Sequence, residues 1–266
     1  MNIFINEKKI EVEDNITLYS LKNKVKKDAD IIIYNSFIVK EDIKIKENDK
    51  IVFIKRGEIP SRQDMEAQLL ARHTPGVHEK IKTSFIGIAG LGGLGSNIAI
   101  ALGRIGVGKL LLVDYDVVEP SNLNRQHYFI KHIGMKKTQA LKEIIAQCNP
   151  YVQVITKDKY IDETNTVDIF KDVDLIIEAV DNPKCKAALT NTVLTKMKNK
   201  KIIAASGVAG YFENNTIVTR KINDNFYIVG DEKSEAAIGM GLMAPRVGIA
   251  ANHQANLALR IILGEE

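Results

Sequence analysis

The chain has 266 residues, 45% of them hydrophobic and 26% charged, which is typical of a globular protein with room for one large and one small domain. The formal net charge of +4 is small and the lysines lie among acidic residues, which argues against a nucleic-acid-binding protein. The sequence contains no apolar run long enough to cross a membrane and no signal-peptide pattern at its start, and both features predict a cytoplasmic protein.

The first 56 residues are predicted to form short strands around one helix. Residues 2–6 and 9–12 have the pattern of a hairpin, and Thr17 is a candidate N-cap for an amphipathic helix. Two β-branched or aromatic runs, 31–34 and 51–54, follow as strands. This ββαββ order predicts a ubiquitin-like β-grasp module over residues 1–56.

The next segment, residues 57–82, changes in character. It opens with glycine and proline, and Ser61 then begins a polar stretch that predicts a helix to about Arg72. We interpret this segment as a linker and helix that lead into a main domain over residues 83–266.

The main domain alternates strands and helices. Near-continuous apolar strands separated by helical patterns indicate a mostly parallel sheet with helices on both faces, a Rossmann-like α/β fold. Pro245 is well placed to open a last helix, 245–263. The predicted strands are 85–89, 109–113, 152–156, 173–179 and 202–205.

A glycine cluster follows the first of these strands and opens a helix. Glycines at such a turn let the backbone approach a phosphate, whose charge meets the free amides of the helix N-terminus. The strand, turn and helix context therefore predicts nucleotide binding. The candidate residues are Gly90, Gly92, Gly93 and Gly95.

An acidic residue stands at the end of the second strand. Asp114 lies about twenty residues beyond the glycines, where a carboxylate usually accepts hydrogen bonds from ribose hydroxyls. We predict that Asp114 binds the ribose, with Asp116 as the second candidate.

A long polar loop after Asp114 contains cations and amides suited to phosphates. Arg125 has a planar fork that matches phosphate oxygens, and Asn122 can donate to phosphate or ribose. Lys137 stands at a predicted helix start and is a second candidate cation, with Lys136 as its alternative. A dehydrogenase needs no such loop, so the pattern favours a nucleoside triphosphate.

Asp181 follows the apolar strand that ends near residue 180. The carboxyl edge of a parallel sheet is where α/β proteins bind ligands. An acid beside a triphosphate most simply holds Mg²⁺, so Asp181 is the predicted metal ligand.

Together these motifs resemble the ThiF/MoeB (HesA) branch of the ubiquitin-activating superfamily. The resemblance covers about residues 65–264 and is most specific at Ser121-Asn122-Leu123-Asn124-Arg125-Gln126. The module at residues 1–56 is similar to ThiS, the sulfur carrier of thiamine synthesis. The overall layout is closest to the short clostridial type of ThiF.

The resemblance implies specific roles and partners. ATP and Mg²⁺ would be the cofactors, with Asp114 on the ribose, Asp181 on the metal, and the phosphates held by Asn122, Arg125 and Lys137. Members of the family commonly form homodimers in which an arginine from an N-terminal helix enters the partner's site. Arg72 is the candidate for that catalytic arginine, followed by Arg62.

Two features depart from the family pattern. Many relatives carry paired CxxC zinc ligands, whereas this chain has only Cys148 and Cys185, so no zinc is expected. A sulfur carrier needs a free Gly-Gly carboxylate, but here Gly57 continues into the next segment. The fused module is therefore expected to serve docking, dimerisation or regulation.

The sequence thus predicts an ATP-dependent adenylyltransferase that activates the C-terminal carboxylate of a separate ThiS-like protein. The loop 230–243 is expected to form a wall or flap for that protein's tail. Three alternatives stay open: a tRNA-modifying dehydratase of the same superfamily, an NAD-dependent dehydrogenase and a non-catalytic binding protein. The missing basic patch argues against the first, and the lack of a histidine placed for hydride transfer argues against the second.

Overall fold

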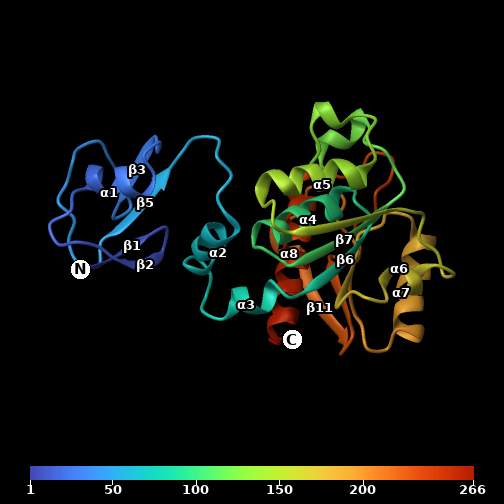
Figure 1. The fold of residues 1–266 in the computed structure, drawn as a ribbon. Helices are drawn as coiled ribbons and strands as arrows, with labels where there is room; N and C mark the ends of the chain where they lie inside the picture. Colours follow the sequence, from blue (N-terminus) through green and yellow to red (C-terminus); the bar gives the residue numbers. More distant parts are fainter. The chain divides into compact units, whose positions relative to one another are not determined.

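The computed structural model describes residues 1–266 and divides into two compact units, residues 1–78 and 79–266. Each unit has its own sheet, and both sheets are visible in Figure 1. None of the helices combines the length and the apolar character that crossing a bilayer requires. The units are described separately below.

The first unit is built on a five-stranded sheet in the order β2-β1-β5-β3-β4. β1 pairs parallel with β5 and all other neighbours are antiparallel. Ile3, Leu18 and Ile51 lie in a core between the sheet and α1. The elements are β1 (Asn2–Ile5), β2 (Lys8–Glu11), α1 (Leu18–Val25), β3 (Ile31–Tyr34), β4 (Phe37–Val39) and β5 (Lys50–Ile54).

The predicted β-grasp module is confirmed, with one added strand. The Thr17 side chain caps α1 by accepting from the Ser20 amide, as predicted. The unpredicted strand is β4, a short edge strand joined to β3 by a tight turn. Asn35 and Ser36 in that turn both have positive φ, as the two central residues of a type I′ hairpin require. Three strand residues carry too weak a pattern to be recognised without that turn.

The polar helix predicted after Ser61 is α2 (Arg62–Leu70). The Ser61 side chain caps it by accepting from the Asp64 amide. Asp64 also forms an ion pair of 2.8 Å with Lys8 of β2, which ties α2 to the β-grasp sheet within the first unit. A short helix that the sequence did not predict, α3 (Val77–Ile81), follows.

The second unit has a seven-stranded sheet in the order β11-β12-β10-β9-β6-β7-β8. Every neighbouring pair is parallel except β11 with β12, so the predicted Rossmann-like α/β fold is confirmed. The strands are β6 (Phe85–Ala89), β7 (Lys109–Asp114), β8 (Gln153–Asp158), β9 (Leu175–Glu178), β10 (Lys201–Ala205), β11 (Val218–Asn223) and β12 (Phe226–Gly230).

Helices cover both faces of this sheet (Figure 1). Leu110 and Leu112 of β7 pack into a core with α4, α5 and α8, whereas Leu111 and Val113 pack into a second core with α6 and α7. The alternation follows from the twofold side-chain period of a strand, and it explains why the central strands are apolar throughout. The helices are α4 (Gly93–Arg104), α5 (Lys137–Cys148), α6 (Thr166–Phe170), α7 (Pro183–Lys196) and α8 (Ala244–Leu263).

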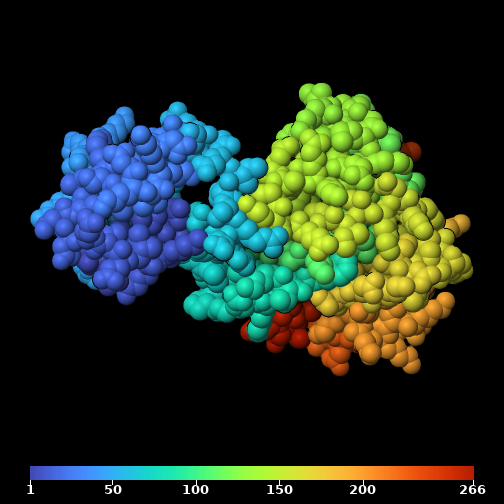
Figure 2. All heavy atoms as spheres, viewed as in Figure 1, coloured from blue at the N-terminus to red at the C-terminus, as the bar shows by residue number.

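The sequence did not predict β11 and β12. All six residues of β11 are exposed and mostly polar, so they lack the apolar pattern of the inner strands. The predicted last helix is confirmed as α8, with Pro245 in its first turn. In the space-filling view, the side chains of the yellow-green segment around α5 and β8 form much of the visible surface of the second unit (Figure 2).

Candidate active site

A cavity of about 780 Å³ opens at the carboxyl edge of the parallel strands. Its lining residues follow β6, β7, β8, β9 and β10, so five strand ends converge on one hollow. Ligand sites of open α/β sheets lie at this edge, and the volume suits a small-molecule ligand.

The glycine cluster forms the turn from β6 into α4. Gly90 has a φ of +86°, and a Cβ there would come within 2.7 Å of the Ala179 carbonyl oxygen. α4 begins within the glycine cluster, at Gly93, and the cap residue Gly92 offers no side chain to the first amides. These amides are therefore available to an anion in the cavity.

Three of the four predicted glycines line the cavity, and Gly95 does not. Gly95 packs under the turn, where a Cβ would stand 1.9 Å from the Gly90 carbonyl oxygen. Only glycine allows this close approach of α4 to the strand end. Gly95 therefore shapes the loop from below, and the structure places no ligand contact on it.

Asp114 is a buried carboxylate in the cavity wall. Its Oδ2 accepts from the Leu91 amide at 2.6 Å and its Oδ1 accepts from the Asp116 amide at 2.8 Å. Burial raises the pKa of Asp114, while these two amides and the charge of Lys137 act in the opposite direction. The amides hold the carboxylate beside the glycine loop, and each oxygen keeps further acceptor capacity for a hydroxyl donor.

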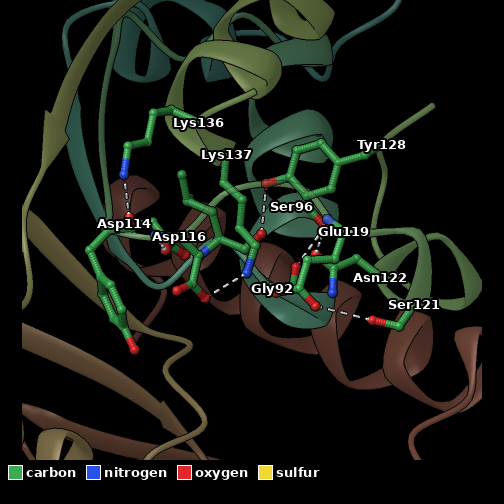
Figure 3. A network of polar contacts seen from close by, with 12 residues as sticks. Gly92, Ser96, Asp114, Asp116, Glu119, Ser121, Asn122, Tyr128, Lys136 and Lys137 are labelled. Atoms are coloured by element: carbon green, nitrogen blue, oxygen red, sulfur yellow. Dashed lines mark hydrogen bonds and ion pairs between the residues drawn. The ribbon is translucent and has the colours of Figure 1, made fainter. Parts of the chain in front are cut away.

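The two neighbouring lysines are clearly distinguished by their surroundings. Lys137 is 7% exposed, lines the cavity and forms a 2.9 Å ion pair with Asp116. Lys136 is exposed, does not line the cavity, and donates to the Tyr115 carbonyl oxygen. Figure 3 shows Lys137 reaching toward Asp116 beside Asp114, with Lys136 on a separate path. The geometry favours Lys137 as the cation that meets a ligand.

The predicted phosphate ligands of the polar loop behave differently. Arg125 lines the cavity, its Nη1 donates to the Asn124 side chain at 2.8 Å, and its buried Nε has no partner. Asn122 is buried in the 3-10 turn η1 (Pro120–Asn124), where its Oδ1 accepts from the Glu119 amide at 3.0 Å. Asn122 does not line the cavity. Its visible role is to hold the turn that presents Arg125, and a phosphate contact by Asn122 stays a prediction.

Asp181 lies at the mouth of the cavity, just beyond β9. Its side chain is exposed, and the adjacent Asn182 caps α7 by accepting from the amides of Lys184 and Cys185. No cluster of three or more histidine, cysteine or acidic side chains is present. One carboxylate with room for phosphate oxygens and waters is the usual protein contribution to a Mg²⁺ site, so Asp181 fits the predicted role.

The sequence did not predict a buried ion pair that lies beside the cavity. Glu178 of β9 is 0% exposed and pairs with Lys186 of α7, which also donates to the Ala205 carbonyl oxygen. Burial raises the pKa of Glu178, against the charge of Lys186. The pair joins the ends of β9 and β10 to α7 around Asp181. The available signal was an acid at the end of an otherwise apolar strand.

Two aromatic side chains at the cavity mouth were also missed. Tyr115 follows Asp114 directly, and Tyr160 follows β8. Their rings meet edge to face at 5.3 Å, and both line the cavity. Rings next to a predicted ribose-binding carboxylate supply an apolar surface that a nucleotide base can contact.

The cysteine beside the cavity, Cys185, lacks the surroundings of a reactive thiol. Cys185 lines the cavity but is buried, and its Sγ donates to the Ile161 carbonyl oxygen at 3.2 Å. Burial raises the pKa of this thiol, which disfavours the nucleophilic thiolate. Cys148 is half-buried at the end of α5.

Arg72, the predicted catalytic arginine from a partner, is exposed just after α2 and belongs to the first compact unit. Its predicted role depends on a second copy of the chain and stays a prediction.

Two segments of the sequence match known families. Residues 65–266 match the ThiF family, and residues 1–57 match the ThiS-like ubiquitin family. The resemblance inferred from the motifs is therefore confirmed.

Curated relatives include adenylyltransferases. The chain is 30% identical over 191 residues to the molybdopterin-synthase adenylyltransferase of Haemophilus influenzae, covering 70% of this chain and 77% of the relative. It is 27% identical over 247 residues to the adenylyltransferase and sulfurtransferase UBA4 of Candida glabrata, covering 89% of this chain and 56% of the relative. The chain thus spans only about half the length of the UBA4 protein.

Solved structures share the fold. The tRNA N6-threonylcarbamoyladenosine dehydratase TcdA of E. coli, in complex with ATP, superposes with a TM-score of 0.69 at 20% identity, covering 76% of this chain and 95% of that one. E. coli MccB with ATP gives 0.55 at 23% identity, covering 71% and 58%. Taken with the residues matched above, the chain is a member of the ThiF family that carries a ThiS-like ubiquitin module at its N-terminus.

Proposed function

We propose that the protein is an ATP-dependent adenylyltransferase that activates the C-terminal Gly-Gly carboxylate of a separate ThiS-like sulfur carrier for thiamine synthesis. The observation that carries the proposal is the convergence of Asp114, Arg125, Lys137 and Asp181 on one cavity beside the glycine turn. The family membership and the adenylyltransferases among the relatives support the same reaction class.

ATP would enter with its ribose at Asp114 and its phosphates along the glycine turn. The amides after Gly92 face the cavity, and the cations Arg125 and Lys137 lie on the same lining. Lys137 is almost fully buried, so its charge is weakly screened by water and acts strongly on a nearby phosphate. The triphosphate would displace part of the Lys137–Asp116 pairing.

The reaction needs little proton chemistry. An oxygen of the carrier's terminal carboxylate attacks the α-phosphorus of ATP, the bond from that phosphorus to the α,β-bridging oxygen breaks, and pyrophosphate leaves with the electron pair. The carboxylate is already ionised at neutral pH, so no general base is required. Positioning and charge neutralisation by Arg125 and Lys137 then account for the acceleration.

Asp181 would hold the Mg²⁺ that accompanies ATP. The ion would supply further charge neutralisation to the phosphate oxygens. The exposed Asp181 carboxylate at the cavity mouth supports a metal shared between protein and nucleotide.

The carrier is identified by class. The Haemophilus influenzae relative, 77% of which this chain covers, is a molybdopterin-synthase adenylyltransferase, whereas the fused module at residues 1–57 matches ThiS-like proteins. That module cannot be its own substrate, because the chain continues past Gly57 into α2. We favour a ThiS-like carrier on the strength of the module, which offers a surface of the same shape for docking or regulation.

The test is to incubate the protein with ATP, Mg²⁺ and a carrier ending in Gly-Gly, and to measure the intact mass of the carrier. We expect the mass of one AMP to be added to a ThiS-like carrier and not to a variant whose last glycine is deleted. A molybdopterin synthase subunit and a bulk tRNA preparation form the competing arms. Adenylation of either of these in place of the ThiS-like carrier would contradict the proposal.

A further inference from the structure

The outer side of the cavity is formed by two loops. The first follows β10, spans residues 206–216 and lines the cavity through residues 206–209. The second follows β12, spans residues 231–243 and lines the cavity through residues 234–236 and Leu242. We call these segments the wall loops. The sequence predicted the second as a wall or flap, and the structure confirms that it borders the cavity.

One buried guanidinium, that of Arg246, joins the two wall loops. Arg246 lies in the first turn of α8 and is 3% exposed. Its Nη1 donates to the carbonyl oxygens of Phe212 and Glu213 at 3.1 and 3.2 Å, and the Phe212 ring lies 5.5 Å from the guanidinium carbon. Its Nη2 donates to Thr216 Oγ1 at 3.1 Å and to Asp231 Oδ2 at 2.7 Å. The first four of these contacts hold the first wall loop, and the last reaches the second.

Asp231 continues the connection into the second wall loop. Its Oδ1 accepts from the amides of Lys233 and Ser234 at 2.9 and 2.8 Å, and its own amide donates to the Gly207 carbonyl oxygen at 3.0 Å. Gly207 has a φ of +76°, and a Cβ there would stand 2.0 Å from Asp231 Oδ1. The two loops are thus packed against each other around one carboxylate.

The Arg246–Asp231 pair does not itself touch the cavity. Neither residue lines it, although the next residue, Val247, does. A Cβ on Gly93 would come within 2.9 Å of Val247, so the start of α8 also packs closely against the glycine turn. The pair therefore acts on the cavity only through the wall loops and the beginning of α8.

We propose that Arg246 is a positioning residue that, through Asp231, holds both wall loops in the shape that receives the tail of the carrier. The inference rests on the proposed adenylyltransferase function and adds a residue that sets how well the protein substrate binds. Asp114 and Asp181 lie at or just beyond strand ends that backbone ladders hold in place. The wall loops lie outside those ladders: three backbone hydrogen bonds link them, and the Arg246 fork supplies the buried side-chain contacts between them. Loosening the fork should weaken carrier binding and leave nucleotide binding nearly unchanged.

The test compares Arg246→Met and Arg246→Lys with a matched control, Arg220→Met. Arg220 forms an exposed ion pair with Glu232 of the second wall loop and lacks the buried fork. We expect Arg246→Met to raise the carrier KM about tenfold or more, equivalent to losing roughly one buried charged contact, with kcat and the ATP Kd within about twofold. Arg246→Lys, which keeps the charge but not the fork, should be intermediate, and Arg220→Met should match wild type.

Limited proteolysis of the same folded variants provides a readout that does not depend on turnover. We expect cleavage within residues 206–216 and 231–243 to be faster in Arg246→Met than in wild type or Arg220→Met. Equal cleavage rates with an unchanged carrier KM would overturn the inference, as would an ATP Kd that weakens as much as the carrier KM. A wild-type protein that adenylates no carrier would instead contradict the proposed function, and the cleavage rates would then decide on Arg246 alone. If Arg246→Met does not fold, Arg246→Lys carries both measurements.

Discussion

The inner and outer halves of the cavity are held in place by different means. In the inner half, the Asp114 carboxylate accepts hydrogen bonds from two backbone amides at the ends of parallel strands. The glycine turn packs directly on the backbone that follows the neighbouring strand. In the outer half, two loops are joined by the side chains of Arg246 and Asp231 and by a few backbone hydrogen bonds. The inner half is thus fixed by the sheet, whereas the outer half is fixed by contacts between loops, with the buried Arg246–Asp231 pair among them.

This difference fits the two substrates of the proposed reaction. ATP has the same chemical structure whichever carrier is used, so a rigid site at the edge of a sheet suits it. A carrier tail is a chain of flexible residues attached to a protein, and loops can change in sequence and length without disturbing the sheet. Substitutions in the inner half should therefore act on the chemistry, and those in the outer half on the protein substrate.

The largest effects should come from the inner half. Arg125→Ala and Asp181→Ala should each lower the rate of adenylate formation by about a hundredfold or more, because the first removes a cation beside the phosphates and the second removes the proposed Mg²⁺ ligand. Lys131→Ala, which removes a surface cation paired with Glu143, is the control. Single-turnover adenylation with purified folded variants measures this. Near-wild-type rates in either inner-half variant would break the assignment of that half to ATP.

The two adjacent lysines sharpen the same assignment. Lys137→Ala should reduce adenylate formation by about a hundredfold, because it removes a buried cation from the cavity. Lys136→Ala should change it by less than about threefold, because Lys136 does not line the cavity and only donates to a backbone carbonyl oxygen, that of Tyr115. The opposite ranking would show that Lys136 is the functional cation.

The ion pair of the outer half should be visible in acid stability. Burial alone would raise the pKa of Asp231, but the amides of Ser234 and Lys233 and the partner Arg246 outweigh it and lower that pKa to about 2. A carboxylate with a lowered pKa stabilises the folded state at pH values above its ordinary pKa of 3.8. This stabilisation is lost as the pH falls through the folded-state pKa.

The expected contribution of Asp231 at neutral pH is about 2 kcal/mol of unfolding free energy. Asp231→Asn should lose this contribution. The difference in unfolding free energy between wild type and the variant, measured by urea unfolding, should become smaller as the pH falls from about 5 toward 2. Asp224→Asn removes a 97% exposed carboxylate that pairs with Lys221 and serves as the control. A difference in unfolding free energy that stays constant across this pH range would contradict the pairing of Asp231 with Arg246.

The smallest effect is expected from the β-grasp module. Deleting residues 1–56 should change adenylate formation at saturating carrier by less than about threefold, because every proposed ATP contact lies after residue 84. A raised carrier KM would indicate docking by the module. A folded, ATP-binding deletion variant that never turns over would show that the module belongs to the catalytic apparatus.

Much of the fold and of the inner half could be predicted because local patterns determine them. Apolar strands flanked by helices predict a parallel sheet, and the carboxyl ends of such strands share one edge. The sequence alone therefore predicts that Asp114 and Asp181 lie at the same edge of the sheet. The edge strands β4 and β11 were missed because they are short or exposed and bury no apolar stripe.

The remaining site residues depend on contacts between distant segments. The pairing of Arg246 with Asp231 crosses fifteen positions and several loop hydrogen bonds, and no spacing rule marks it. Asn122 shows that a residue in a recognisable motif can also have a structural role, because its side chain holds the turn at Glu119 and does not line the cavity, while its predicted phosphate contact stays a prediction. Sequence patterns predict which types of residue lie near the site better than they predict the contact that each residue makes.

The most direct test of the account is carrier-dependent exchange of labelled pyrophosphate into ATP by the full chain. The proposed reaction is reversible at the acyl-adenylate, so label should enter ATP only when ATP, Mg²⁺ and a ThiS-like carrier with a free Gly-Gly carboxylate are all present. Exchange that is absent with every such carrier, or calorimetric binding of NAD with no binding of ATP, would contradict the central claim.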